Sequence, residues 1–87
     1  MTHISYEELE VRLKEARERV PVGARYAHYK HPDELYVVKN HVIIEKTDTV
    51  AVIYESEQHQ VPFSRPLEDF LATVVVEGKS VSRFSPC

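Results

Sequence analysis

At 87 residues, the chain has room for one domain with a single core and no second lobe. Hydrophobic residues make up 43% of it and charged residues 29%, which favours a folded globular domain over intrinsic disorder. The 11 basic residues are outnumbered by 14 acidic ones, and the resulting net charge of −3 weighs against non-specific binding to a nucleic-acid backbone.

The chain opens with a predicted amphipathic helix over residues 5–19, and Pro21 ends it. Ser5 and Glu8 form a capping box, in which the hydroxyl and the carboxylate satisfy free backbone donors. Apolar residues recur at helical spacing along one face: Tyr6, Leu9, Leu13, Ala16 and Val20. We expect this stripe to be buried against a sheet.

Three extended segments follow, at about residues 24–30, 35–45 and 49–55. The first two are separated by a predicted turn at 31–34, which contains a proline. A polar break at 39–41 falls inside the second segment and predicts a bend or bulge there. The third segment is apolar on both faces, so we expect one face to line a barrel interior and the other to contact the helix.

Residues 61–65 are predicted to form a shorter strand, and Pro62 places it at a sheet edge or a bulge. A helical turn at 66–71, begun by a proline, follows it. The chain then forms a predicted hairpin with strands at 74–76 and 80–84.

Together these elements predict a mainly β (α+β) fold, a small SH3-like antiparallel barrel preceded by one amphipathic N-terminal helix. Residues 1–21 would supply the helix, packed on the same domain, and residues 22–87 the small β-barrel. A small α+β sheet with the helix across one face is the alternative, because the sequence does not decide the strand pairing.

The single cysteine, Cys87, cannot form an intrachain disulfide, and it suits a reducing compartment. No apolar run approaches the ~20 residues that a membrane-spanning helix needs. Acidic residues stand where a secretory signal would be apolar: Glu7, Glu8 and Glu10. We therefore predict a cytoplasmic protein with no membrane partner.

Chemistry is densest at residues 26–30, where period two places Tyr26, His28 and Lys30 on one strand face. Tyr26 and Phe63 are the aromatic residues that we expect at a partly open surface. The other aromatic residues are expected in the core: Tyr29, Tyr36, Tyr54, Phe70 and Phe84. Arg65 would either bind an anionic group bidentately or clamp the carbonyls of the following helical turn.

No metal site, cofactor or catalytic residue is predicted. His28 and His31 have the spacing of a metal-ligand pair, but side chains three apart on a strand point to opposite faces, and no cysteine adds to them. The serines lack a nucleophile elbow, and two glycines cannot form a usual phosphate-binding loop. Glu45 could act as a general base beside His28, although a surface carboxylate is the simpler interpretation.

A set of motifs from about Val22 to Phe84 resembles the bacterial family called domain of unknown function 1653. The matching residues are Gly23, Tyr26, His28-Tyr29-Lys30, Tyr36-Val37-Val38, Glu45, Ile53-Tyr54, Arg65-Pro66-Leu67, Phe70, Gly78-Lys79 and Arg83-Phe84. The resemblance implies a fold and a bacterial cytoplasmic location, and no activity. This chain departs from the family at Ala27, where members often have a basic residue, and at Phe63, where they often have tryptophan.

We therefore predict a non-catalytic binding module with an exposed aromatic and basic face. Its ligand-binding residues would be Tyr26, His28, Lys30, Glu45, Phe63 and Arg65. The ligand would be planar or anionic: a nucleotide-like small molecule, a single-stranded oligonucleotide or a peptide. Two alternatives stay open, a small enzyme acting on a nucleotide or sugar with His28 and Glu45 as acid and base, and a ligand-free homodimer associating through the helix or a sheet edge.

Overall fold

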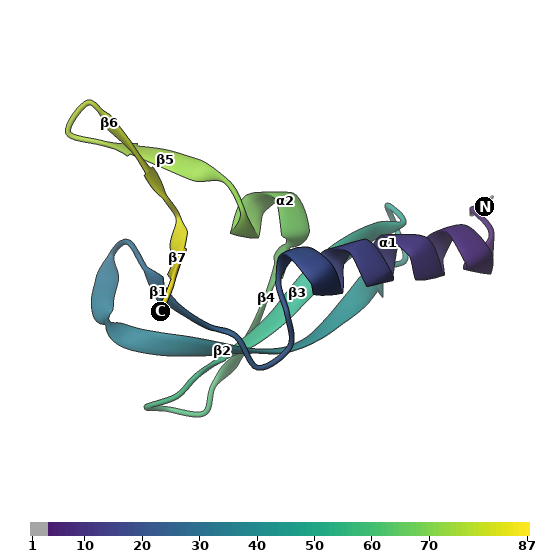
Figure 1. Cartoon of the computed structure of the whole chain (residues 1–87), viewed down its shortest axis with the longest axis horizontal. Helices are drawn as coiled ribbons and strands as arrows, with labels where there is room; N and C mark the ends of the chain where they lie inside the picture. The colour runs from purple at the N-terminus through teal and green to yellow at the C-terminus, as the bar shows by residue number, and fades with distance from the viewer. Residues whose placement is uncertain (1–3) are drawn as a thin grey trace.

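The computed structural model describes residues 4–87 and contains two helices and seven strands (Figure 1). In chain order these are α1 Tyr6–Arg19, β1 Arg25–His28, β2 His31–Ile44, β3 Thr49–Ser56, β4 Pro62–Pro66, α2 Leu67–Phe70, β5 Thr73–Val76, β6 Lys79–Ser82 and β7 Phe84–Pro86.

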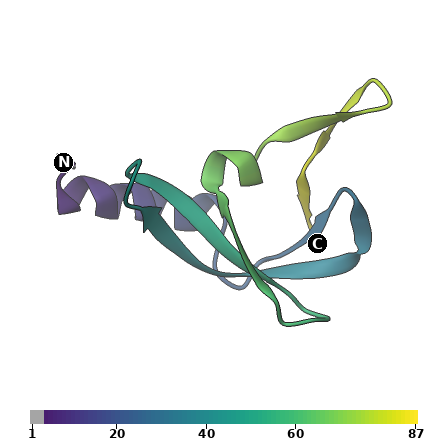
Figure 2. The ribbon, with the colours of Figure 1, turned by 180° about the vertical axis from the view of Figure 1, so that it is seen from behind.

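Five strands form one antiparallel sheet in the order β4-β3-β2-β1-β7. The remaining two, β5 and β6, pair only with each other, as a hairpin that projects from the body in both views (Figures 1 and 2). The fold is thus mainly β with one long N-terminal helix, as the sequence predicts. The bent five-stranded sheet is consistent with an SH3-like barrel, although its edge strands β4 and β7 do not pair with each other in residues 4–87.

Helix α1 begins at the predicted cap, where the Ser5 side chain accepts a hydrogen bond from the Glu8 N–H at 3.2 Å. Ala16 and Val20 are fully buried against the sheet, and Leu13 packs on the same core while half-buried. The prediction that Tyr6 belongs to the buried stripe is wrong, because Tyr6 is 85% exposed. The first turn of α1 extends past the tip of the β2–β3 hairpin (Figure 1).

The core is closed by α2 and β7, which bring Phe70 and Phe84 onto the concave face of the sheet. Tyr36 and Tyr54 are buried beside them, as expected, whereas Tyr29 is half-buried. Tyr26 was expected at an open surface but is only 7% exposed, since its ring packs edge-on against Phe70 at 5.1 Å.

Two strand boundaries differ from the predictions. The turn after β1 consists of Tyr29 and Lys30, and β2 already begins at His31, so Lys30 does not share a strand face with Tyr26. This tight turn is stabilised by the Lys30 N–H, which donates to Nδ1 of His28 at 3.1 Å. The second strand of the hairpin also ends early, because Phe84 opens a separate strand, β7, that pairs with β1.

Other local predictions are confirmed. The register of β2 against β3 shifts between Val38 and Asn40, where the polar break predicted a bulge. Strand β4, which carries Pro62, lies at a sheet edge. Within residues 4–87, neither helix has the length and apolar character needed to cross a membrane.

Candidate functional site

A cavity of about 170 Å³ opens at the concave face of the sheet, and all five strands contribute to its wall. Its lining residues are His28, His31, Tyr36, Tyr54, Phe63, Arg65 and Phe84. The site thus combines aromatic rings with three basic side chains, and no carboxylate lines it.

The register of the sheet explains why the rings converge. Tyr54 stands directly opposite Phe63 on β4, and cross-strand partners share a face of the sheet. Their rings are stacked with centroids 5.7 Å apart. Tyr54 is buried whereas Phe63 is 44% exposed, so Phe63 offers the open ring surface on which a planar group could stack.

Arg65 lies on the same concave face because it pairs with the buried Val52. Its guanidinium carbon lies 5.9 Å from the centroid of the Phe84 ring. Its Nε is buried and has no hydrogen-bond partner among the described residues. A buried donor without a partner costs free energy, so this N–H is available to an acceptor that enters the cavity.

His28 presents a second donor. Since its Nδ1 accepts the Lys30 N–H, the neutral ring carries its proton on Nε2. Burial lowers the pKa of His28, and neighbouring positive charges lower it further; they belong to Arg65, His31, Arg83 and Lys30. Because all the charged neighbours that shift this pKa are positive, an anion bound beside His28 would be stabilised.

Glu34 supplies a carboxylate beside the cavity, where it lines the neighbouring pocket that shares His31. Its Oε1 accepts a hydrogen bond from the Ser56 hydroxyl at 2.7 Å, and His59 lies 3.9 Å away. These contacts, the first above all, lower the pKa of Glu34 and keep it ionised. Within residues 4–87 the hydrogen bond of this carboxylate goes to Ser56, and none joins it to Arg65.

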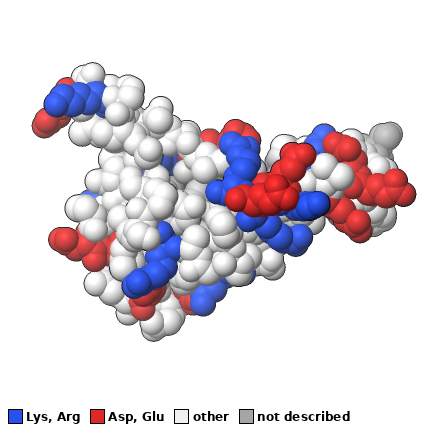
Figure 3. Space-filling view, viewed as in Figure 1, with Lys and Arg blue, Asp and Glu red and all other residues white. Residues whose placement is uncertain are grey.

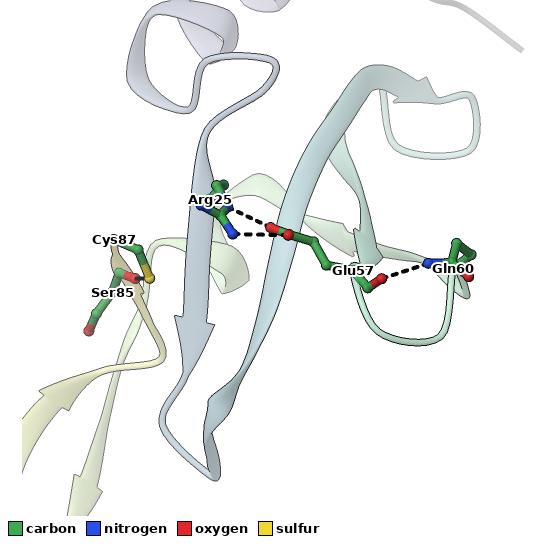
Figure 4. A network of polar contacts seen from close by, with 5 residues as sticks. All are labelled: Arg25, Glu57, Gln60, Ser85 and Cys87. Atoms are coloured by element: carbon green, nitrogen blue, oxygen red, sulfur yellow. Dashed lines mark hydrogen bonds and ion pairs between the residues drawn. The ribbon is translucent and has the colours of Figure 1, made fainter.

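Arg25 shows what a paired arginine looks like in this chain (Figure 4). Its Nε and Nη2 donate to the two carboxylate oxygens of Glu57 at 2.6 and 3.0 Å, and these contacts raise the pKa of Arg25. Within residues 4–87, Arg65 has no carboxylate partner of this kind. Arg25 is therefore part of a structural ion pair, whereas Arg65 is a candidate binding group.

The structure unites only part of the predicted site. His28, Phe63 and Arg65 line one cavity, whereas Lys30 lines a neighbouring one that shares His31. Tyr26 is buried in the core, as described above.

Glu45 lies elsewhere. It follows the far end of β2, a strand of 14 residues that would span roughly 40 Å or more if straight. His31, which lines the cavity beside His28, opens the same strand, so His28 and Glu45 do not converge. The two side chains that the alternative acid–base hypothesis uses thus line different cavities.

Sequence reasoning missed Tyr36, Tyr54 and Phe84 as cavity residues because it assigned them to the core. They are buried, yet one side of each ring faces the cavity. The alternation of β3 could have placed Tyr54 on the same face as Val52, but the pairing of Val52 with Arg65 has no sequence signal. In the part of the chain that the structure describes, no three His, Cys, Asp or Glu side chains gather as a metal site would require.

Comparison with known proteins identifies the family of the chain. The sequence profile of a family described as protein of unknown function (DUF1653) matches residues 24–86, which include all of the cavity residues. Neither the curated proteins nor the solved structures contain a match to the chain.

Proposed function

The chain belongs to the DUF1653 family of proteins of unknown function, and we propose that it is a non-catalytic binding module for a ligand that carries an anionic group beside a planar one. The observation that carries this proposal is the buried, unpartnered Nε of Arg65 inside an aromatic cavity. An anionic oxygen would satisfy that donor and neutralise the guanidinium together.

The size of the cavity supports binding of one end of a ligand. Its 170 Å³ is below the ~300–1,000 Å³ typical of pockets that enclose a whole drug-sized molecule. A phosphate or carboxylate would enter between Arg65 and Nε2 of His28. The rest of the ligand would lie outside, with a planar ring stacked on Phe63.

A nucleoside monophosphate is the simplest probe with both groups. Binding would be measured by calorimetry, alongside inorganic phosphate, the free nucleoside and a short single-stranded oligonucleotide. We expect the monophosphate to bind more tightly than either of its parts. Arg65→Met should weaken this binding about ten- to a hundredfold, as expected for a lost charged hydrogen bond worth ~1.5–3 kcal/mol.

Arg25→Met is the matched control, because it removes an arginine that is already paired with Glu57. Equal affinities for the two variants would overturn the proposal, as would a screen in which no phosphate or carboxylate ligand shifts the resonances of His28 and Arg65.

We also propose a bacterial cytoplasm as the location of this module. The family resemblance supports the bacterial origin, and the lone exposed thiol of Cys87 supports a reducing compartment. Cell fractionation of the source organism with an antibody against the chain would test it.

A further inference from the structure

A second cavity, of about 510 Å³, lies between α1 and the far end of β2, separate from the cavity that holds Arg65. Its apolar lining comes from both elements and consists of Ile4, Tyr6, Leu9, Leu13 and Ile43. The volume falls in the range typical of ligand pockets. We call this space the α1–β2 groove.

The edge of β2 beside the groove is open. Strand β1 pairs with β2 only as far as Val37, and the last backbone bonds on that side join Val38 to Gly23 and Ala24. Beyond the bulge, no strand among residues 4–87 covers the outer edge of β2.

Antiparallel alternation identifies the free backbone groups. The Ser56 N–H on β3 donates to the Val61 carbonyl beside β4, so the backbone groups of Ser56 point toward β4. Backbone groups at odd-numbered positions of β3 point the other way. Those of Ala51 and Ile53 therefore point toward β2, where these residues pair with Val42 and Asn40. The residues of β2 between and after them, His41 and Ile43, therefore direct their N–H and C=O groups outward, and Glu45 follows just past the end of the strand.

One of these outward backbone groups bonds to a side chain instead of a strand, as expected for a group at an open edge. The N–H of His41 donates to Oδ1 of Asn40 at 2.8 Å. The N–H and C=O of Ile43 and the N–H of Glu45 have no backbone partner in the described chain. An added strand would find these groups in the correct alternation.

The groove is also acidic. Its charged lining residues are Glu10, Glu45 and Asp48, and no lysine or arginine lines it. Figure 3 shows acidic side chains predominating at the end of the molecule where α1 begins. Arg12 on α1 lines the cavity on the opposite flank of the helix and binds Glu8 and the carbonyl of Asp48.

We propose that the α1–β2 groove is a peptide-binding site that adds an extended segment, with basic and apolar residues in alternation, as a strand on the edge of β2. The peptide backbone would bond to Ile43 and Glu45. Its apolar side chains would enter the groove between Leu9, Leu13 and Ile43, and its basic side chains would meet the carboxylates at the rim.

The charge pattern argues against a second copy of the chain as the occupant. Symmetric pairing of two β2 edges about Ile43 would place Glu45 of one copy opposite His41 of the other and bring the acidic grooves of both copies to one seam. Carboxylates gathered at one seam repel each other, which disfavours this pairing. A basic partner removes this repulsion and gains attraction instead.

The test uses a synthetic seven-residue peptide of alternating lysine and valine with blocked ends. Five residues of open edge span about 16 Å, which this peptide can cover. Binding would be followed by backbone amide shifts and by hydrogen exchange in the intact chain. We expect shifts at Leu13, Ile43 and Glu45, and roughly tenfold slower exchange of the Ile43 N–H.

Two changes separate the main-chain and charge contributions. A peptide with methylated amide nitrogens at alternate positions keeps its charges, so a loss of at least about tenfold in affinity would assign the binding to strand addition. Glu10→Lys with Glu45→Lys should weaken the lysine peptide by about tenfold or more and bind a glutamate–valine peptide instead. Glu18→Lys with Glu77→Lys is the control of equal charge change, because both residues are exposed and lie outside the groove.

Three results would overturn the proposal. The first is a methylated peptide that binds as well as the parent, and the second is a control double variant that loses as much affinity as the groove variant. The third is a dimer in sedimentation without peptide, with the Ile43 N–H protected, which would make a second copy the occupant. The methylated peptide is tested on the wild-type chain, so the proposal stays falsifiable even if the groove variant does not fold.

Discussion

The rings of Phe70 and Phe84 lie nearly parallel, 9° apart, with centroids separated by 4.2 Å. Phe70 ends α2, and Phe84 opens β7 after the projecting hairpin. This stack therefore joins the last strand of the chain to the helical turn that precedes the hairpin. Phe84 also contacts the ring of His28 edge-on at 4.9 Å, which links the core to the cavity.

Phe84→Ala should lower the free energy of unfolding by about 3–5 kcal/mol, because it removes a large buried ring that neighbouring side chains cannot replace. Urea denaturation followed by circular dichroism measures the change. Phe63→Ala, at the exposed partner of Tyr54, serves as the comparison and should cost clearly less. Similar losses for both would contradict the role given to the Phe70–Phe84 stack.

Ala16→Asp should destabilise the chain by several kcal/mol, since it places a carboxylate at a fully buried position of α1 within the apolar core. Leu13→Asp should destabilise in the same direction but less, because Leu13 is only half-buried. Val11→Asp on the exposed side of α1 is the control and should fall within about 0.5 kcal/mol of the parent. Thermal melts rank the three variants, and a stable Ala16→Asp protein would show that α1 does not dock as described.

Lowering the pH below 6.5 should destabilise the fold through His41. Its ring is 3% exposed, and burial lowers its pKa, as does Arg17 to a smaller extent. The Val20 carbonyl favours the protonated ring, but neither ring nitrogen makes a hydrogen bond of good geometry, so burial prevails. The unfolded chain then binds a proton that the folded chain excludes, and the stabilisation present above pH 6.5 is lost as pH falls toward the lowered pKa.

Urea midpoints at pH 7.5 and pH 5 measure this effect, and His41→Phe should reduce the difference between them. His28 shifts in the same direction, so part of the pH dependence should persist in that variant. His59→Ala is the comparison: it removes an exposed histidine that pairs with Glu34 and should leave the contribution of His41 in place. A His41→Phe protein with the full pH dependence of the parent would assign the effect to other groups.

Arg65→Met should leave the free energy of unfolding unchanged or raise it by about 1 kcal/mol. It removes a buried donor without a partner and keeps an apolar side chain of similar length over Phe84. Arg25→Met should instead lower stability slightly, because it leaves Glu57 without its partner. Chemical denaturation of both variants provides the comparison, and strong unfolding of Arg65→Met would identify Arg65 as a structural clamp.

Most features of the fold that the sequence predicted correctly depend on residues close together in the chain. The Ser5 cap, the bulge after Val38 and the edge position of β4 each follow from residues close together in the sequence. The failures concern contacts between distant segments: Tyr26 is buried by Phe70, and β7 exists because Phe84 is drawn into the core beside β1. The arrangement of the candidate site depends on distant contacts in the same way. The register of β3 against β4 places Arg65 among the rings, and the length of β2 separates Glu45 from His28.

The prolines of the two outermost strands have a consequence for the protein at high concentration. The alternation set by Ser56 and Val61 directs the backbone of residues 62, 64 and 66 outward from β4, and two of these are Pro62 and Pro66, which have no N–H. At the opposite edge, the Cys87 N–H bonds to the Arg25 carbonyl, so the neighbouring Pro86 faces outward in the same way. These two borders of the sheet therefore offer fewer backbone donors to an added strand, which disfavours stacking of copies through β4 or β7.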